Sequence, residues 1–286
     1  MRNLFYFLLV NAVLFTACEG EDEQLPAYLY LEDIRVSTTA DEGTARDKVT
    51  NAQVYVGGEY IGVVNVPGRV PVLQEGPTEI VIDPLVRDNG SSATLALYPF
   101  YERMTLNVDL RPLQTDTLRP VTTYAGDRTE FLFVESFDSP GTVLVDDRDG
   151  NAGTALELTD EGALEGLSAR FVVDTDNPRL EIATDPTQPF DLRSRIAGTY
   201  LEMDFKSEIL FQVGLVGLSA NLPPTAAYSY ILAPKDEWTK IYLNLTSEVR
   251  ASDFDGYQIG ILANLPEDGT TSGTVYIDNL KLVTYR

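Results

Sequence analysis

The residues of this chain that are able to do chemistry are almost all carboxylates. Its 286 residues include 44 aspartates and glutamates, no histidine and a single cysteine, Cys18. The absence of histidine excludes Ser–His and Cys–His nucleophile pairs, an imidazole base and imidazole-ligated zinc. One cysteine cannot form an internal disulfide. Two kinds of carboxylate chemistry remain, which are cation binding by oxygen ligands and glycoside hydrolysis by a pair of acids.

Two pairs of acids have a spacing that would suit hydrolysis. Glu202 precedes Asp204, and Asp253 precedes Asp255. Residues two apart on a strand point to the same face, which in an acidic chain is usually the solvated face. Glycosidases instead set their acids in a deep cleft lined with aromatic side chains, and this chain has too few of these. We therefore predict that the protein is not an enzyme.

The elements that must position these acids are predicted to be strands. Short runs of strand formers are separated by 21 glycines and 16 prolines, and no long amphipathic helical pattern appears. The first run, 27–39, is expected to form one strand, and Gly57-Gly58 is a hairpin signal. We predict an all-β protein with two tandem β-sandwich domains, the first over 27–125 and the second, a jelly roll, over 126–286.

The balance of charge limits the class of partner. The formal net charge is −23, and nucleic-acid binding requires a cationic face. We therefore predict no nucleic-acid partner. A chain of this charge is better suited to a cationic ligand or a metal ion.

Four stretches of the second region resemble the galactose-binding-like jelly roll that many carbohydrate-binding modules share. They are VESFD (134–138), EWTKIYLNLT (237–246), YQIGI (257–261) and GTVYIDNLKLV (273–283). Relatives with this fold bind sugars, bind proteins or act as spacers, so the resemblance implies a fold more than a function. It also implies that Trp238 is a buried structural residue.

The same resemblance implies a calcium site. In that fold the first and last strands lie together, and acids there often hold a structural calcium ion, which suggests Glu135, Asp138 and Asp278 as ligands. The alternative is that Asp278 caps a turn and Glu135 is exposed. Another acidic run, VDDRDGN (145–151), lacks the distal glutamate of an EF-hand loop and is more typical of an acidic surface loop.

A sugar-binding face would need exposed aromatic rings. With Trp238 assigned to the interior, the candidates are tyrosines. Tyr228 and Tyr230 are two apart on a predicted strand and are expected to share a face, with Tyr200 and Tyr257 as more distant candidates. The alternative is that these tyrosines pack in the core or at a sheet edge.

The N-terminus resembles a bacterial lipoprotein signal. Arg2 precedes an apolar run that is too short to span a bilayer. FTAC (15–18) then resembles the lipobox, although Phe15 stands where leucine is commoner. The resemblance implies a signal peptide over 1–17 and covalent acyl chains, such as palmitate, on Cys18. An ordinary secretory peptide or a buried helix is the alternative.

Acidic residues follow Cys18 at once, in the run EGEDE (19–23). This run is either a solvated part of the tether, 18–26, or a signal similar to the acidic export tag that sends lipoproteins of one Gram-negative phylum to the outer face of the outer membrane. Residues 52–84 and YPFYE (98–102) are also similar to small β-sandwich modules of uncharacterised surface lipoproteins, which imply no activity.

Together these patterns predict a non-catalytic lipoprotein of the outer membrane, lipid-anchored and facing the cell exterior. We expect it to act as an accessory or adhesion-type binding subunit of a membrane complex, with an outer-membrane β-barrel protein as the partner. The alternative is glycan capture beside a Sus-type nutrient-uptake system. The scarcity of tryptophan, which has one copy in the chain, favours the first of these.

Overall fold

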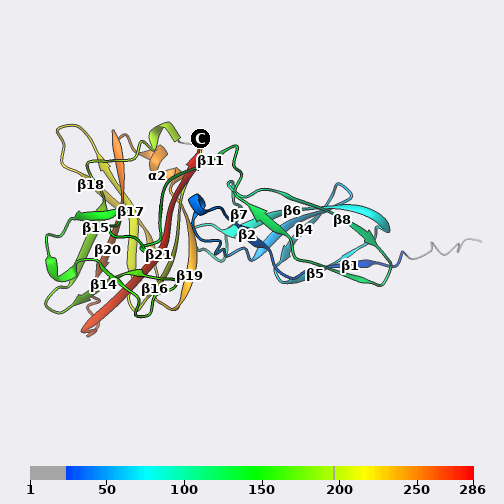
Figure 1. The fold of residues 1–286 in the computed structure, drawn as a ribbon, viewed down its shortest axis with the longest axis horizontal. Coiled ribbons are helices and arrows are strands. Elements are labelled where there is room, and N and C mark those ends of the chain that lie inside the picture. Colours follow the sequence, from blue (N-terminus) through cyan, green and yellow to red (C-terminus); the bar gives the residue numbers. More distant parts are fainter. Residues whose placement is uncertain (1–23, 196) are drawn as a thin grey trace, which may run out of the picture.

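The computed structural model describes residues 24–195 and 197–286, so Cys18 and the acidic run after it lie outside the described residues. The molecule is elongated, with two β units arranged end to end (Figure 1). Strand β1 begins at the tip of the N-terminal unit that is farther from the C-terminal unit. The C-terminus lies near the junction of the two units.

The elements follow one another along the chain with few helical turns. In chain order they are β1 Ala27–Leu31, β2 Arg35–Ser37, η1 Ala40–Glu42, β3 Asn51–Val56, β4 Glu59–Asn65, β5 Gly68–Val72, β6 Gly76–Arg87, β7 Leu95–Leu97, β8 Met104–Leu110, β9 Thr115–Leu118, β10 Val121–Thr123, β11 Thr129–Glu135, β12 Leu144–Asp147, η2 Ala152–Thr154, β13 Glu157–Thr159, β14 Ser168–Asp174, β15 Arg179–Thr184, η3 Arg193–Arg195, β16 Thr199–Ser207, β17 Phe211–Leu218, β18 Thr225–Leu232, β19 Lys235–Asn244, α2 Thr246–Ala251, β20 Gly256–Asn264 and β21 Ser272–Tyr285.

The N-terminal unit is a sandwich of small sheets. One sheet has the order β4-β3-β6-β7 with β8 also paired to β6, another is β5-β1-β9, and β10 pairs with β2. The β3–β4 hairpin is confirmed, and Gly57 and Gly58 at its turn both have positive φ, 57° and 85°. The prediction of one strand over 27–39 is wrong, because β1 and β2 hydrogen-bond into different sheets.

The C-terminal unit is a jelly-roll sandwich of two antiparallel sheets. One has the order β13-β14-β21-β16-β19, with β11 also paired to β21, and the other is β12-β15-β20-β17-β18. Apolar side chains from both sheets fill the space between them. The short helix α2 was not expected from the sequence. No helix in the described ranges is long and apolar enough to cross a membrane.

A second apolar core crosses the junction between the two units. It joins Tyr98 and Tyr101 of the N-terminal unit to Tyr200, Tyr242 and Val283 on the outer face of the sheet that contains β16, β19 and β21. The ring centroid of Tyr98 lies 5.2 Å from that of Tyr200 and 5.0 Å from that of Tyr242. The YPFYE run therefore fills the junction, so the two sandwiches are packed together rather than only tethered.

A buried carboxylate, Glu202, lies at the centre of this junction. Tyr98 Oη donates to it over 2.6 Å, Tyr124 Oη over 2.8 Å, and Lys240 Nζ lies 2.9 Å from it. Glu202 and Asp204 are both fully buried, so the expectation that they lie on a solvated face is wrong. The face they share is the one that the N-terminal unit covers.

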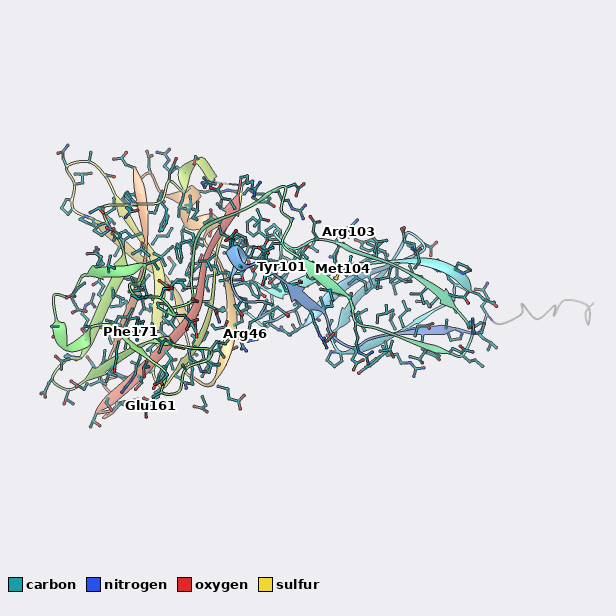
Figure 2. All side chains as sticks on the ribbon, viewed as in Figure 1. Arg46, Tyr101, Arg103, Met104, Glu161 and Phe171 are labelled. Carbon is teal, nitrogen blue, oxygen red and sulfur yellow. The ribbon has the colours of Figure 1, made fainter. Side chains whose placement is uncertain are left out.

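Further polar contacts cross the same junction. Lys281 Nζ donates to the carbonyl oxygen of Thr44 over 2.8 Å, and Arg46 Nε donates to Asp204 Oδ1 over 3.3 Å. Figure 2 shows Arg46 and Tyr101 at this boundary. Burial works to raise the pKa of Glu202, but the charges of Lys240 and Lys281 outweigh it and hold this pKa below its usual value.

Replacement of Glu202 tests this arrangement. Glu202→Gln removes the carboxylate that is paired with the buried Lys240, so we expect the free energy of unfolding in urea at pH 7 to fall by about 3–5 kcal/mol. Asp109→Asn, which affects an exposed pair with Arg111, is the control and should change stability little.

The pH dependence gives the same variant a second readout. Because the folded pKa of Glu202 is lowered, its contribution to stability is present above its unfolded pKa and is lost as the pH falls through the folded value. The Glu202→Gln variant should lose this part of the acid sensitivity. A variant with unchanged stability and an unchanged acid profile would show that the junction does not depend on this charge.

Candidate functional site

The four tyrosines expected to form a sugar platform do not lie together on an exposed face. Tyr200, Tyr230 and Tyr257 are 5%, 7% and 1% exposed, and Tyr228 is half-buried. Tyr257 Oη and Ser252 Oγ share a hydrogen bond of 2.9 Å, and Tyr230 Oη donates to the carbonyl oxygen of Asn244. These hydroxyl groups are therefore used inside the protein.

A β-bulge explains why Tyr228 and Tyr230 do not share a face. The register between β17 and β18 shifts in this stretch, so Tyr230 points into the core. Tyr228 instead donates to Glu181 Oε1 over 2.9 Å, and Arg148 Nε donates to the same oxygen over 3.1 Å. The spacing of two predicted a common face only for a regular strand.

The three carboxylates of the predicted calcium site are used to cap the backbone. Glu135 is buried and accepts from the N–H groups of Phe137 (2.7 Å) and Val143 (2.9 Å), and Asp138 accepts from the N–H of Leu167 (2.8 Å). Within the described residues, no group of three or more Asp, Glu, Cys or His side chains is arranged to hold a metal ion. Calcium binding stays a prediction without an assembled ligand set.

Asp278 accepts hydrogen bonds inside the protein, but it lies within β21 rather than in a turn, and Glu135 is buried rather than exposed as the alternative expected. Asp278 Oδ2 accepts from Ser168 Oγ and Asp278 Oδ1 from the N–H of Asn279, both at 2.7 Å. Burial raises the pKa of Asp278 to about 6, and Asp204 across the strand pair adds to this effect. This carboxyl group is therefore close to neutral in mildly acidic solution.

Two other assignments are resolved by the structure. The acidic run 145–151 folds back on its own backbone, since Asp147 accepts from Gly150 and Asp149 from Asn151, as expected of a surface loop. Trp238 is wrongly assigned to the interior. It is half-buried, lies outside the apolar core, and donates its indole N–H to the carbonyl oxygen of Gly162 over 3.1 Å.

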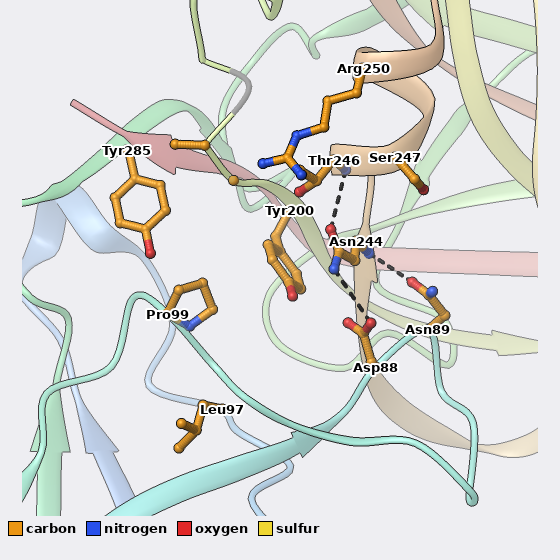
Figure 3. Close-up of a pocket in the computed structure, with 12 residues that line it drawn as sticks. Asp88, Asn89, Leu97, Pro99, Tyr200, Asn244, Thr246, Ser247, Arg250 and Tyr285 are labelled. Carbon is orange, nitrogen blue, oxygen red and sulfur yellow. Dashed lines mark hydrogen bonds between the residues drawn. The ribbon is translucent and has the colours of Figure 1, made fainter.

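A concave site lies between the two units. It is a pocket of about 450 Å³, shown in Figure 3, and both units contribute to its walls. The N-terminal unit supplies the turn after β6 and the segment after β7. The C-terminal unit supplies the ends of β19 and β21, the start of β16, and α2. Its lining residues include Asp88, Asn89, Pro99, Tyr200, Asn244 and Tyr285.

A tight turn brings the N-terminal wall to β19. Asn89 and Gly90 both have positive φ, 55° and 70°, and a Cβ at Gly90 would lie 2.9 Å from Ile241 Cδ1. The positive φ at Gly90 favours glycine at this position. The backbone N–H of Asn244 donates to Asn89 Oδ1 over 2.7 Å, and Asn244 Nδ2 donates to Asp88 Oδ2 over 3.4 Å. The side-chain amides of Asn89 and Asn244 thus hold the N-terminal wall of the pocket against β19.

Two features of this pocket are suited to a hydroxylated ligand. Asp88 Oδ1 is buried and meets no donor at ordinary hydrogen-bond geometry among the described residues, and the phenol of Tyr200 is the neighbouring hydroxyl group that interacts with this carboxylate. The half-buried ring of Tyr285 lies on the opposite wall (Figure 3). Burial and the neighbouring Asp88 carboxylate raise the pKa of Tyr200, which keeps its phenol protonated. Sequence reasoning did not single out Asp88 or Tyr285, since they are brought together only by the packing of the two units.

Comparison with known proteins gives likeness at the level of structure alone. No protein-family model and no curated protein sequence matches the chain. The family 11 carbohydrate-binding module from Clostridium thermocellum, solved with a β-1,3-1,4-mixed-linked tetrasaccharide, is 15% identical with a TM-score of 0.35, and the match covers 49% of this chain and 93% of that module.

Two other modules give similar values. A family 29 module variant complexed with mannohexaose is 17% identical over 55% of this chain and 92% of its own, with a TM-score of 0.34. The family 30 module of a cellulosomal cellulase of Clostridium thermocellum is 14% identical over 54% and 96%, also with a TM-score of 0.34. At these values no ligand can be transferred from these modules to this chain.

Asp278→Asn separates an internal hydrogen-bond acceptor from a calcium ligand. Since the folded pKa of Asp278 is raised to about 6, the wild type loses stability relative to the variant as the pH rises through this range. We expect the variant to gain about 1 kcal/mol at pH 7.5 and nothing at pH 4, as measured by urea unfolding.

The same substitution at the exposed Asp109, which lies outside the predicted calcium site, is the control and should have little effect at either pH. A calcium ligand at Asp278 would give the opposite result. The wild type would melt at a lower temperature in chelator, and Asp278→Asn would be less stable than the wild type in calcium.

Proposed function

We propose that this chain is a non-catalytic, carbohydrate-binding lipoprotein of the cell surface, and that the pocket between its two units holds the sugar. The observation that supports this most directly is a pocket of about 450 Å³ that both units line with polar side chains and with the half-buried ring of Tyr285. A pocket with few, fixed polar groups between two domains is a common form of ligand site.

The character of the walls favours a sugar over other small ligands. Asn89 and Asn244 contribute amides, which can both donate and accept, and Tyr285 presents a partly exposed ring for the apolar face of a pyranose. Hydroxyl-rich ligands need this mixture of donors and acceptors.

The same lining argues against catalysis. Among the described residues that line the pocket, Asp88 is the single carboxylate, whereas glycoside hydrolysis needs two acids about 5–9.5 Å apart. The chain has no histidine to act as an alternative base. Binding without turnover is the activity that fits these groups.

A lipid on Cys18 would orient the molecule in a useful way. The described chain starts beside β1, at the tip of the N-terminal unit, and the C-terminal unit lies at the other end (Figure 1). An anchor before residue 24 would thus put the N-terminal unit next to the membrane and hold the pocket away from it. The acidic tether, 18–26, would keep the unit off an anionic lipid surface.

Loss of the two key side chains tests the sugar proposal. We expect the wild type to bind at least one oligosaccharide on a glycan array, and Asp88→Asn and Tyr285→Ala to weaken that binding about tenfold or more in titration calorimetry. Tyr60→Ala, which removes an exposed tyrosine of β4, is the matched control and should bind normally. Wild-type binding that both pocket variants retain would exclude this pocket.

A second candidate function, partner binding, is favoured by the edge strand β4. Its Tyr60, Ile61 and Val63 are 55%, 37% and 48% exposed, and within the described residues β4 pairs with β3 alone. An exposed apolar edge is suited to adding an extended segment of another protein. The occupant we propose is such a segment of an outer-membrane β-barrel protein, because a lipid on Cys18 would hold this unit at the membrane.

Gentle solubilisation distinguishes the two functions. The wild type should co-purify with a barrel protein from detergent-solubilised membranes, and Ile61→Lys with Val63→Lys should release it, since charges on an edge strand oppose pairing. Asp88→Asn should leave the complex intact. Recovery of the wild-type chain alone would argue against a partner at β4 and leave the sugar proposal unaffected.

A further inference from the structure

The lysines of this chain are gathered in one place. The sequence contains five, and four of them belong to three neighbouring strands of the sheet that the N-terminal unit covers. The fifth, from the N-terminal unit, donates its Nζ to Thr239 on one of these strands. They are Lys206 on β16, Lys235 and Lys240 on β19, Lys281 on β21, and Lys48. In a chain with a net charge of −23 this concentration of cations is not expected from composition.

Three of these lysines line a second cavity at the junction. Lys48, Lys235 and Lys240 surround a space of about 240 Å³, whose other lining is apolar or neutral. Among the described residues that line it there is no carboxylate. Asn89 lines both this cavity and the sugar pocket, so the two spaces are neighbours on either side of the same turn.

The positive charge of this cavity is not neutralised from within. Lys240 is paired with Glu202, but neither Lys48 nor Lys235 forms an ion pair with any described carboxylate. Burial lowers the pKa of Lys48, and the charges of Lys235 and Arg87 lower it further, against a smaller opposing effect of Asp204. An anion in the cavity would offset the repulsion between these cations.

We propose that this cavity binds an oxyanion group, a carboxylate or a sulfate, carried by the sugar that occupies the neighbouring pocket. This inference rests on the proposed function and narrows its ligand to an acidic glycan. Lysine ammonium groups supply charge-assisted hydrogen bonds to such oxygens. Because Asn89 lines both spaces, an acidic group on a sugar in the first pocket would lie next to the lysines of the second.

The overall negative charge of the protein does not prevent this. Exposed charges farther apart than about 8 Å are largely screened at physiological ionic strength, whereas a lysine cluster acts at contact distance. The acidic surface would instead slow the approach of polyanions and favour short or sparsely charged glycans. Affinity for the charged ligand should therefore fall as salt is added.

Titration calorimetry with the full chain and four probes tests this. The probes are tetragalacturonate, a sulfated carrageenan tetrasaccharide, uncharged galactotetraose and inorganic sulfate. We expect at least one charged tetrasaccharide to bind about tenfold more tightly than galactotetraose. Lys48→Gln and Lys235→Gln should each weaken that binding roughly five- to tenfold and leave galactotetraose unchanged.

Arg111→Gln removes an exposed positive charge directly after β8 in the N-terminal unit, and it is the control for a change in net charge. Thermal melting of each variant confirms that it is folded. Retention of charged-sugar affinity by folded Lys48→Gln and Lys235→Gln variants would overturn the inference and leave the proposed function standing. Galactotetraose that binds as tightly as the charged tetrasaccharides would also overturn the inference and leave the proposed function standing.

The opposite failure gives a different pattern. Binding of inorganic sulfate that Lys48→Gln weakens, with no tetrasaccharide bound by any variant, would uphold the oxyanion cavity but reject the glycan function. If none of the four probes binds, both proposals are overturned. A comparison of the affinities for tetragalacturonate and for the sulfated tetrasaccharide identifies which oxyanion the lysines prefer.

Discussion

The buried carboxylate of Glu202 is the interaction on which the arrangement of this molecule depends. An isolated charge of this kind is too costly to bury, so it is retained only because Lys240, Tyr98 and Tyr124 surround it. The donors come from both units. Neither sandwich alone can satisfy this group, and the pairing therefore fixes how one unit sits on the other.

Both candidate sites are consequences of that fixed junction. In the pocket between the two units, which we propose as the sugar site, Asp88 and Asn89 of one unit lie opposite Asn244 and Tyr285 of the other. In the second cavity, Lys48 of the N-terminal unit lies opposite β19. A flexible link between two sandwiches would not hold these groups at constant distances. The hydrogen bond from the Asn244 N–H to Asn89 extends the same rigid contact into the pocket wall.

The sequence predicted local backbone features correctly, but it did not predict correctly which face of a sheet a side chain occupies. The hairpin at Gly57-Gly58 follows from backbone geometry at two residues, and the last strand follows from a long run of strand formers. The face of a side chain depends on everything that packs against its strand. Glu202 was assigned to solvent because nothing in its neighbourhood along the chain shows that YPFYE covers it, and Tyr230 because a bulge is not visible as a spacing.

The sequence by itself determined the all-β class, the absence of histidine chemistry and the acidic character, because these depend on composition and on short-range backbone preference. The tertiary structure decided which side chains lie close together. Asp88 and Asn244 are far apart in the chain, as are Lys48 and Lys235, and no local pattern links them. Only the packing of one sandwich on the other, held by a carboxylate that must be shared, brings them to the same pockets.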